Sequence, residues 1–218
     1  MLVCRLQRIF QQHCNRHRPH TARYRCDPGG AFCSRIKIDI TGEFSIRQAI
    51  DADIDYGGTG LGLPIVMTIG NRAIGAPINI WNDQQDSMSM RDAGWIQLYA
   101  ETNQEALDLH IQAFRLAEEL SVPVMVCMDG FILTHAYEQV DMPGQAEVDR
   151  FLPPFSPRQI LDPQQPVTIG AMVGPEAFTE VRYLAHYRQM QALWMIPELA
   201  EDFEEQFGRA SGGVLNIL

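Results

Sequence analysis

Two short apolar runs decide the fold: residues 63–70 read LPIVMTIG and residues 122–128 read VPVMVCM. Each run is rich in β-branched residues and is bounded by proline, glycine or polar residues, which is typical of a strand buried in a sheet. An amphipathic stretch lies between them. Strand, loop, helix and strand in this order predict an α/β fold with a parallel sheet and flanking helices.

The stretch between the two runs predicts a long loop followed by a helix. Residues 71–94 are rich in Asn, Asp, Gly and Pro, which favours an ordered, functional loop. Thr102 and Glu105 then match the sequence pattern of a capping box. Apolar residues recur behind this pattern at helical spacing and predict one apolar helix face: Ala106, Leu109, Ala113, Leu116, Ala117 and Leu120.

The last part of the chain predicts an extended arm and a long helix. Residues 138–175 are rich in proline and show little periodicity, so we expect an arm over a surface, with short strand pieces such as residues 167–169. The helix is predicted over residues 176–207, with Pro197 inside it and Gly208 at its end.

The first 62 residues carry a net positive charge, whereas the rest of the chain carries a net negative charge. Residues 1–62 hold nine Lys and Arg against six Asp and Glu, whereas residues 63–218 hold eight against 21, which gives a net charge of −10. The early basic residues are scattered and the body is acidic, so we expect no nucleic-acid partner. No apolar run approaches the roughly 20 residues that cross a bilayer. We therefore expect a cytoplasmic protein with no membrane span.

The cysteines do not follow a metal-binding pattern. Four of them, Cys4, Cys14, Cys26 and Cys33, precede the first run, and Cys127 lies in the second. Since no CxxC pair occurs, neither a zinc ribbon nor an iron–sulfur site is predicted, and free thiols are the simplest interpretation. An irregular metal site that combines these cysteines with nearby histidines stays open as an alternative.

Four motifs, in order along the chain, carry a resemblance to a known family: NRA-x-x-APINIWND, RD-x-GWIQ, QEALD and PVMVC-x-DGF-x-x-TH. With them, residues 63–209 resemble part of the alpha subunit of pyruvate:ferredoxin (2-oxoacid:acceptor) oxidoreductases. The resemblance implies an incomplete thiamine diphosphate-binding fold. Its pyrimidine-type α/β domain would span residues 63–137, and residues 138–218 would form the connector and the long helix.

The resemblance implies a subunit of an enzyme that oxidatively decarboxylates a 2-oxoacid, with pyruvate expected, to an acyl-CoA. Thiamine diphosphate would be shared with a beta-type partner that holds its diphosphate and Mg²⁺, and cluster-bearing subunits would pass electrons to ferredoxin. This chain has neither the GDG…NN motif that holds Mg-diphosphate nor cluster-type cysteine spacing. We therefore expect no metal site in it and no activity of the chain alone.

Arg72 is the candidate substrate-binding residue. The resemblance implies that the arginine of the NRA motif pairs with the 2-oxoacid carboxylate, and a planar guanidinium offers such a group two parallel donors. The alternative is a structural salt bridge to Asp83 or Asp86. We expect that these two acids and Asn71 support the loop, although a self-satisfied turn amide and solvated acids are equally open. Asp129 is expected to brace the loop after the second run.

The first 62 residues depart from the family pattern. The resemblance implies a catalytic glutamate on a helix upstream of the NRA motif, but only Glu43 stands there, and no helical pattern surrounds it. The catalytic and cofactor-binding residues are therefore left unassigned. We hypothesise that residues 1–62 are out of frame or disordered, and that the chain is alternatively an inactive fragment that acts as an assembly or interaction module.

Overall fold

The computed structural model describes residues 39–40, 58–79, 81–160, 162–170 and 172–213. The strands are β1 (Asp39–Ile40), β2 (Val66–Asn71), β3 (Ile96–Tyr99) and β4 (Val124–Asp129). The helices are α3 (Gln85–Met88), the 3-10 helix η1 (Arg91–Ala93), α4 (Asn103–Leu120), α5 (Ile132–His135), α6 (Gln145–Phe151) and α7 (Phe178–Phe207). Most of the segment 1–62, predicted to be atypical, lies outside these residues.

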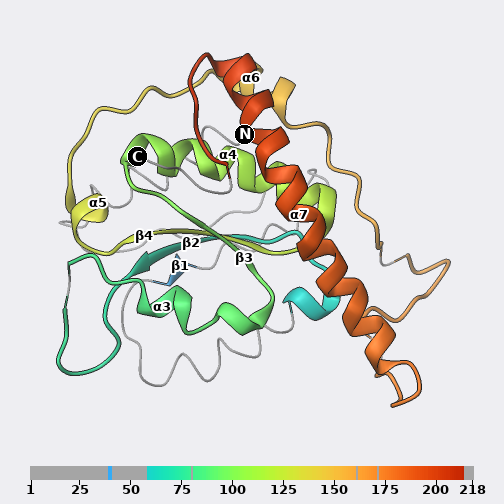
Figure 1. Cartoon of the computed structure of the whole chain (residues 1–218). Helices are drawn as coiled ribbons and strands as arrows, with labels where there is room; N and C mark the ends of the chain where they lie inside the picture. The colour runs from blue at the N-terminus through green and yellow to red at the C-terminus, as the bar shows by residue number, and fades with distance from the viewer. Residues whose placement is uncertain (1–38, 41–57, 80, 161, 171, 214–218) are drawn as a thin grey trace.

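The four strands form one parallel sheet in the order β1-β2-β4-β3 (Figure 1). β4 is buried along its whole length. Val124 and Val126 face the core under α4, whereas Met125 and Cys127 join a second cluster with Trp95 on the opposite face. A strand covered on both faces needs a nearly continuous apolar sequence, which confirms the prediction made from residues 122–128.

Helices cover both faces of the sheet: Figure 1 shows α4 on one side and α3 on the other. Thr102 is the N-cap of α4, and its hydroxyl accepts the backbone N–H of Glu105 at 3.1 Å. The Glu105 carboxylate accepts the N–H of Glu101 at 2.7 Å, one residue further upstream than the predicted capping box. The predicted apolar face of α4 is buried against the sheet and α7. The α/β fold predicted from the sequence is therefore confirmed.

The C-terminal half of α7 packs on α4 and α6. Phe203 lies against Phe151 and Phe207, with ring centroids 5.5 and 4.4 Å away. Full burial of such a side chain contributes roughly 1.5–3 kcal/mol. After Gly208 ends the helix in a left-handed conformation, Arg209 binds both carboxylate oxygens of the buried Asp108 on α4, at 2.9 and 2.7 Å. These contacts fix the end of α7 to the α/β body.

Three parts of the structure differ from the prediction. Residues 96–99 form β3, and residues 145–151 of the predicted arm form α6. Residues 167–169 are not a strand, so that expectation was wrong. As predicted, α7 contains Pro197 and ends before Gly208. Among the helices in the described part of the chain, none has the length and apolar character that a membrane span requires.

Replacement of Gly130 should test the pairing of β2 with β4. A Cβ at this position would collide with the backbone oxygen of Asn71. We expect Gly130→Ala to lower the free energy of unfolding by about 1–3 kcal/mol, because backbone atoms must move to accept it. Urea unfolding measures the change. Gly60→Ala is the matched control, since nothing lies within 4 Å of its added Cβ; equal effects of the two variants would contradict the prediction.

Acid should destabilise the fold through His110, which is 2% exposed. Its ring lies 2.5 Å from the Ala106 oxygen and 2.6 Å from the Thr68 hydroxyl. Burial lowers the pKa of His110, more than the Ala106 contact raises it. The unfolded chain therefore binds a proton first as the pH falls below about 6.5, and up to ~1.4 kcal/mol of stability is lost per pH unit.

Urea unfolding at about pH 7.5 and about pH 5.5 measures this loss. We expect a smaller difference between the two pH values for His110→Gln than for the unmodified chain. His186→Gln, on an exposed position of α7, should keep the difference of the unmodified chain. An undiminished difference in His110→Gln would show that another group carries the pH dependence.

Candidate functional site

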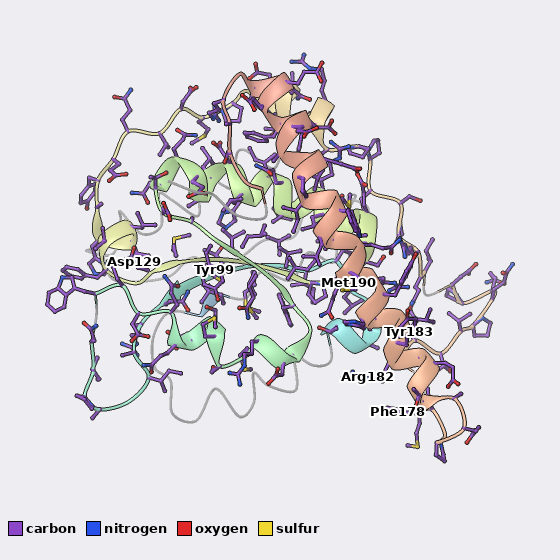
Figure 2. The ribbon with its side chains drawn as sticks, viewed as in Figure 1. Tyr99, Asp129, Phe178, Arg182, Tyr183 and Met190 are labelled. Carbon is purple, nitrogen blue, oxygen red and sulfur yellow. The ribbon has the colours of Figure 1, made fainter. Side chains whose placement is uncertain are left out.

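The carboxyl ends of β2 and β4 meet at one edge of the sheet. Asn71, the last residue of β2, pairs with Asp129, the last residue of β4. Figure 2 shows Asp129 and Tyr99, which ends β3, at this edge. Loops that leave the carboxyl ends of parallel strands are where α/β proteins usually bind ligands. The loops after β2 and β4 therefore define the candidate site.

Arg72 is the first residue after β2, and its side chain is half-buried. Its backbone N–H donates to Asp86 Oδ2 at 2.8 Å. The ion pairs among the described residues do not join its guanidinium to Asp83 or Asp86. Asp86 thus holds the backbone of Arg72, and the described acids leave the guanidinium donors available to a ligand.

Asp86 lies in a partly desolvated position. Burial raises the pKa of its carboxyl, and the nearby Asp83 raises it further, whereas the backbone N–H and the positive charge of Arg72 oppose the rise. Asp83 accepts the backbone N–H of Gln85 at 2.8 Å. Gln85 in turn accepts the N–H of Ile74 at 2.9 Å. The short helix α3 and the Arg72 segment are therefore joined by several hydrogen bonds.

Asn71 is completely buried and links β2 to α3. Its Oδ1 accepts the backbone N–H of Ser87 at 2.8 Å, and its Nδ2 donates to Gln84 Oε1 at 2.5 Å. Both ends of the amide are thus satisfied inside the protein. The Asn71 side chain therefore has one partner on α3, Ser87, and a second partner in Gln84, the residue that precedes α3.

Sequence reasoning missed the residues that complete this network. The Tyr99 hydroxyl lies 3.0 Å from Ser87 Oγ and donates to Gln97 Oε1 at 2.8 Å. Gln97 Nε2 donates to the Ser87 carbonyl at 2.8 Å. Burial raises the pKa of Tyr99, so its hydroxyl stays protonated at neutral pH. The sequence did contain a signal for these two residues. Gln97 and Tyr99 alternate along residues 96–99, and alternate residues of a strand lie on the same face.

Cys127 lies beneath the network and is completely buried. Burial raises the pKa of its thiol to about 12, although Ser87 and Asn71 oppose the rise. The nucleophilic form of cysteine is the thiolate. Cys127 therefore does not act as a nucleophile near neutral pH.

Aromatic side chains connect the two loops of the site. Phe131, in the loop after β4, packs edge-on against Trp81 and tilted against His135, with centroids 5.2 Å apart in both pairs. Asp129 accepts the backbone N–H of Phe131 at 3.0 Å and those of the next two residues. This confirms that Asp129 braces the loop.

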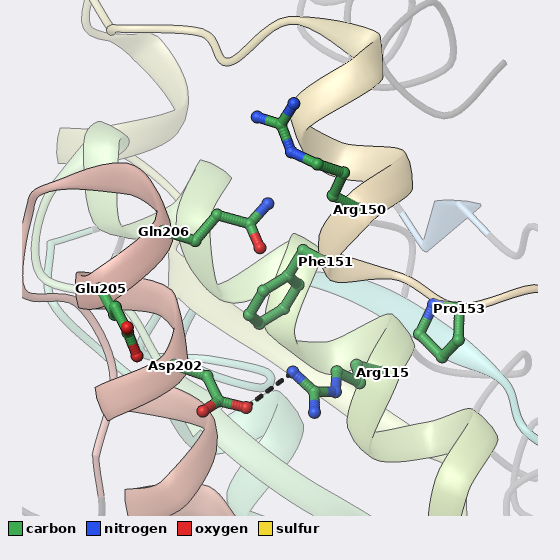
Figure 3. A pocket seen from close by; sticks show the side chains of 7 residues that line it. All are labelled: Arg115, Arg150, Phe151, Pro153, Asp202, Glu205 and Gln206. Carbon is green, nitrogen blue, oxygen red and sulfur yellow. Dashed lines mark ion pairs between the residues drawn. The ribbon is translucent and has the colours of Figure 1, made fainter.

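A surface hollow of about 550 Å³ lies away from this edge, between α4, α6 and α7 (Figure 3). Its walls hold charges of both signs, and Arg115 pairs with Asp202 across it at 2.9 Å. The residues that line it are Arg115, Arg150, Phe151, Pro153, Asp202, Glu205 and Gln206. None of the predicted site residues is among them.

Comparison with known proteins agrees with the four motifs. Residues 56–201 match the family described as "Pyruvate flavodoxin/ferredoxin oxidoreductase, thiamine diP-bdg". The pyruvate synthase subunit PorA of Methanosarcina barkeri is 50% identical over 163 residues, which cover 74% of this chain and 40% of the relative. The ketoisovalerate oxidoreductase subunit VorA of Pyrococcus abyssi is 39% identical over 191 residues, 87% of this chain and 48% of the relative.

The alignments reach beyond the part in which the motifs lie. The pyruvate synthase subunit PorA of Methanocaldococcus jannaschii is 42% identical over 199 residues, 90% of this chain and 50% of the relative. Since this alignment is longer than residues 63–218, it extends into residues 1–62. The chain spans half or less of the length of these relatives. The match over residues 56–201 shows that the chain belongs to the thiamine diphosphate-binding family of pyruvate flavodoxin/ferredoxin oxidoreductases.

Proposed function

We propose that the chain works as the alpha-type subunit of a 2-oxoacid:ferredoxin oxidoreductase, which decarboxylates a 2-oxoacid oxidatively to an acyl-CoA. Pyruvate is the proposed substrate. The relatives named as pyruvate synthase subunits are 42–50% identical to the chain, whereas those named as ketoisovalerate oxidoreductase subunits are 38–39% identical. The compartment that fits this role and the unpaired thiol of Cys127 is the cytoplasm.

The position of Arg72 carries the proposal. Arg72 follows a central strand at its carboxyl end, and Asp86 and Asp83 accept backbone N–H groups around it without an ion pair to its guanidinium among the described residues. A guanidinium stays charged at every physiological pH and binds a carboxylate through two parallel N–H donors. Such a group suits the carboxylate of a 2-oxoacid, because it fixes the acid in one orientation.

The described residues fit thiamine diphosphate only in part. When bound, this cofactor supplies the carbon that attacks the 2-oxo group, and its activation needs a carboxylate at the aminopyrimidine ring. Asp83 and Asp86, in the loop after β2, and Asp129, at the end of β4, each accept backbone N–H groups. None of these three carboxylates is therefore assigned to the pyrimidine. Glu43, which stands upstream of the NRA motif without a helical pattern around it, falls outside the described residues, so no step is derived through the cofactor.

The remaining parts of the reaction are assigned to partners. A beta-type subunit would hold the diphosphate and Mg²⁺, because the GDG…NN motif is missing from this sequence. Cluster-bearing subunits would carry electrons to ferredoxin, because no cluster-type cysteine spacing occurs here. The names of the relatives, which are subunits of oxidoreductases, support the presence of other subunits.

A second candidate function is an inactive assembly module. It is favoured because Asp86 and Asp129, two carboxylates beside the strand ends, bind backbone N–H groups, so neither is assigned to the cofactor. Co-expression with a beta-type partner separates the two functions. An enzyme subunit should give 2-oxoacid-dependent reduction of a viologen dye above background, whereas a module should bind the partner stably and give no reduction.

Within such a complex, Arg72→Gln should lower kcat/KM for pyruvate by roughly tenfold to a hundredfold, the equivalent of ~1.5–3 kcal/mol for a charge-assisted hydrogen-bonded pair. Steady-state dye reduction measures it. Arg91→Gln is the matched control, because the Arg91 side chain is 65% exposed on η1. An unchanged kcat/KM in Arg72→Gln, in a complex that assembles normally, would remove Arg72 from the substrate site.

A further inference from the structure

The short helix α3 is held from both sides of the central strand β4. The strand order places β4 between β2 and β3. From β2, Asn71 Oδ1 accepts the backbone N–H of Ser87 at 2.8 Å. From β3, Gln97 Nε2 donates to the Ser87 carbonyl at 2.8 Å, and the Tyr99 hydroxyl lies 3.0 Å from Ser87 Oγ. The N–H, the carbonyl and the hydroxyl of one residue of α3 thus contact side chains from two strands.

α3 depends on these contacts for its position. It has only four residues, and helices much shorter than about 12 residues are marginal without tertiary contacts. Of its four residues, all of which the structure describes, Ser87 is the one that is buried, with 1% of its surface exposed. The place of α3 on the sheet is therefore set where Ser87 meets the side chains of β2 and β3.

α3 in turn holds the backbone around Arg72. Asp86, which precedes Ser87 on α3, accepts the Arg72 N–H at 2.8 Å. Gln85 Oε1 accepts the N–H of Ile74 at 2.9 Å. Both acceptors belong to the same turn of α3. A shift of α3 relative to the sheet would therefore move the backbone from which the Arg72 side chain extends.

We infer that Tyr99 of β3 is a positioning residue for the guanidinium of Arg72 and acts on it through α3. The inference rests on the substrate-binding role proposed for Arg72. In the sheet, Tyr99 and Arg72 lie on opposite sides of β4, and the contact of the Tyr99 hydroxyl with Ser87 leads to α3. A guanidinium that binds a carboxylate through two parallel N–H donors tolerates little displacement. The place of α3 therefore affects how well Arg72 meets a 2-oxoacid.

The Tyr99 hydroxyl performs this role without adding a charge to the site. It donates to Gln97 Oε1 at 2.8 Å, which leaves its oxygen available to accept the hydroxyl proton of Ser87. Burial raises the pKa of Tyr99, so the hydroxyl is neutral at neutral pH. Removal of this one oxygen therefore changes no charge near Arg72, and its effect on a bound carboxylate comes from geometry.

Steady-state kinetics of the complex with a beta-type partner test the inference. Tyr99→Phe should raise KM for pyruvate roughly three- to tenfold, the loss expected for one neutral hydrogen bond. It should leave kcat and the KM for coenzyme A unchanged, because Arg72 is proposed to bind only the 2-oxoacid. Partial misfolding would instead lower kcat and leave KM unchanged. Tyr137→Phe is the matched control, since Tyr137 is 85% exposed before α6, and it should leave KM for pyruvate unchanged.

A double-mutant cycle shows whether Tyr99 acts through Arg72. In the Arg72→Gln background, Tyr99→Phe should raise KM for pyruvate by less than about twofold, because the group that Tyr99 positions is already gone. The same factor in both backgrounds would show that Tyr99 acts independently and would overturn the inference. Ser87→Ala removes the other oxygen of the 3.0 Å contact and should raise KM as Tyr99→Phe does. An unchanged KM in Ser87→Ala would contradict a path through α3.

Amide hydrogen exchange of the full chain needs no turnover, so it separates this inference from the proposed function. Tyr99→Phe should speed the exchange of the Arg72 N–H by about threefold or more, whereas the amides of β4 should exchange as in the unmodified chain. If the unmodified complex reduces no dye with pyruvate, the proposed function fails, and the exchange at Arg72 still decides whether Tyr99 orders this segment. Unchanged exchange at Arg72 would overturn the inference even in an active complex.

Discussion

Six pairs of residues join β2 to β4 in parallel register, from Val66 with Val124 to Asn71 with Asp129. Because the register is fixed, both strands end at the same level, and the loops that follow them begin side by side. A slip by one residue would turn the buried side of β2 to the opposite face and would separate Asn71 from Asp129. The close approach of Gly130 to the backbone of Asn71 adds a steric limit to this register.

The residues around Arg72 bind the backbone of its segment and not its guanidinium. Asn71 and Asp86 hold the backbone of the segment and of α3, through the N–H groups of Ser87 and Arg72. Tyr99 and Gln97, on β3, hold Ser87. The guanidinium itself takes no part in these bonds. In the role proposed for Arg72, the backbone that carries the guanidinium is already ordered before a carboxylate binds, and this preorganisation favours affinity and orientation.

Sequence predicted the elements whose signals are local. β2 and β4 are apolar runs, α4 has a cap and an apolar face, and α7 ends just before Gly208. β3 was missed because its four residues owe their conformation to pairing with β4, and the seven residues of α6 are too few for a clear period. In the site, Asn71 and Asp86 stand out in a polar loop. Gln84 and Ser87 bind Asn71 only because α3 folds against the strand ends, and no spacing of residues along the chain predicts that packing.

Contacts at the C-terminal end of α7 fix the direction of the whole helix. Arg209 binds the buried Asp108 of α4, and Phe203 packs between Phe151 and Phe207, so the direction of the helix is set by the α/β body. The first half of α7 then extends outward as part of a helix that is already formed. The order of this exposed half therefore comes from the backbone hydrogen bonds of the helix and from contacts at its other end.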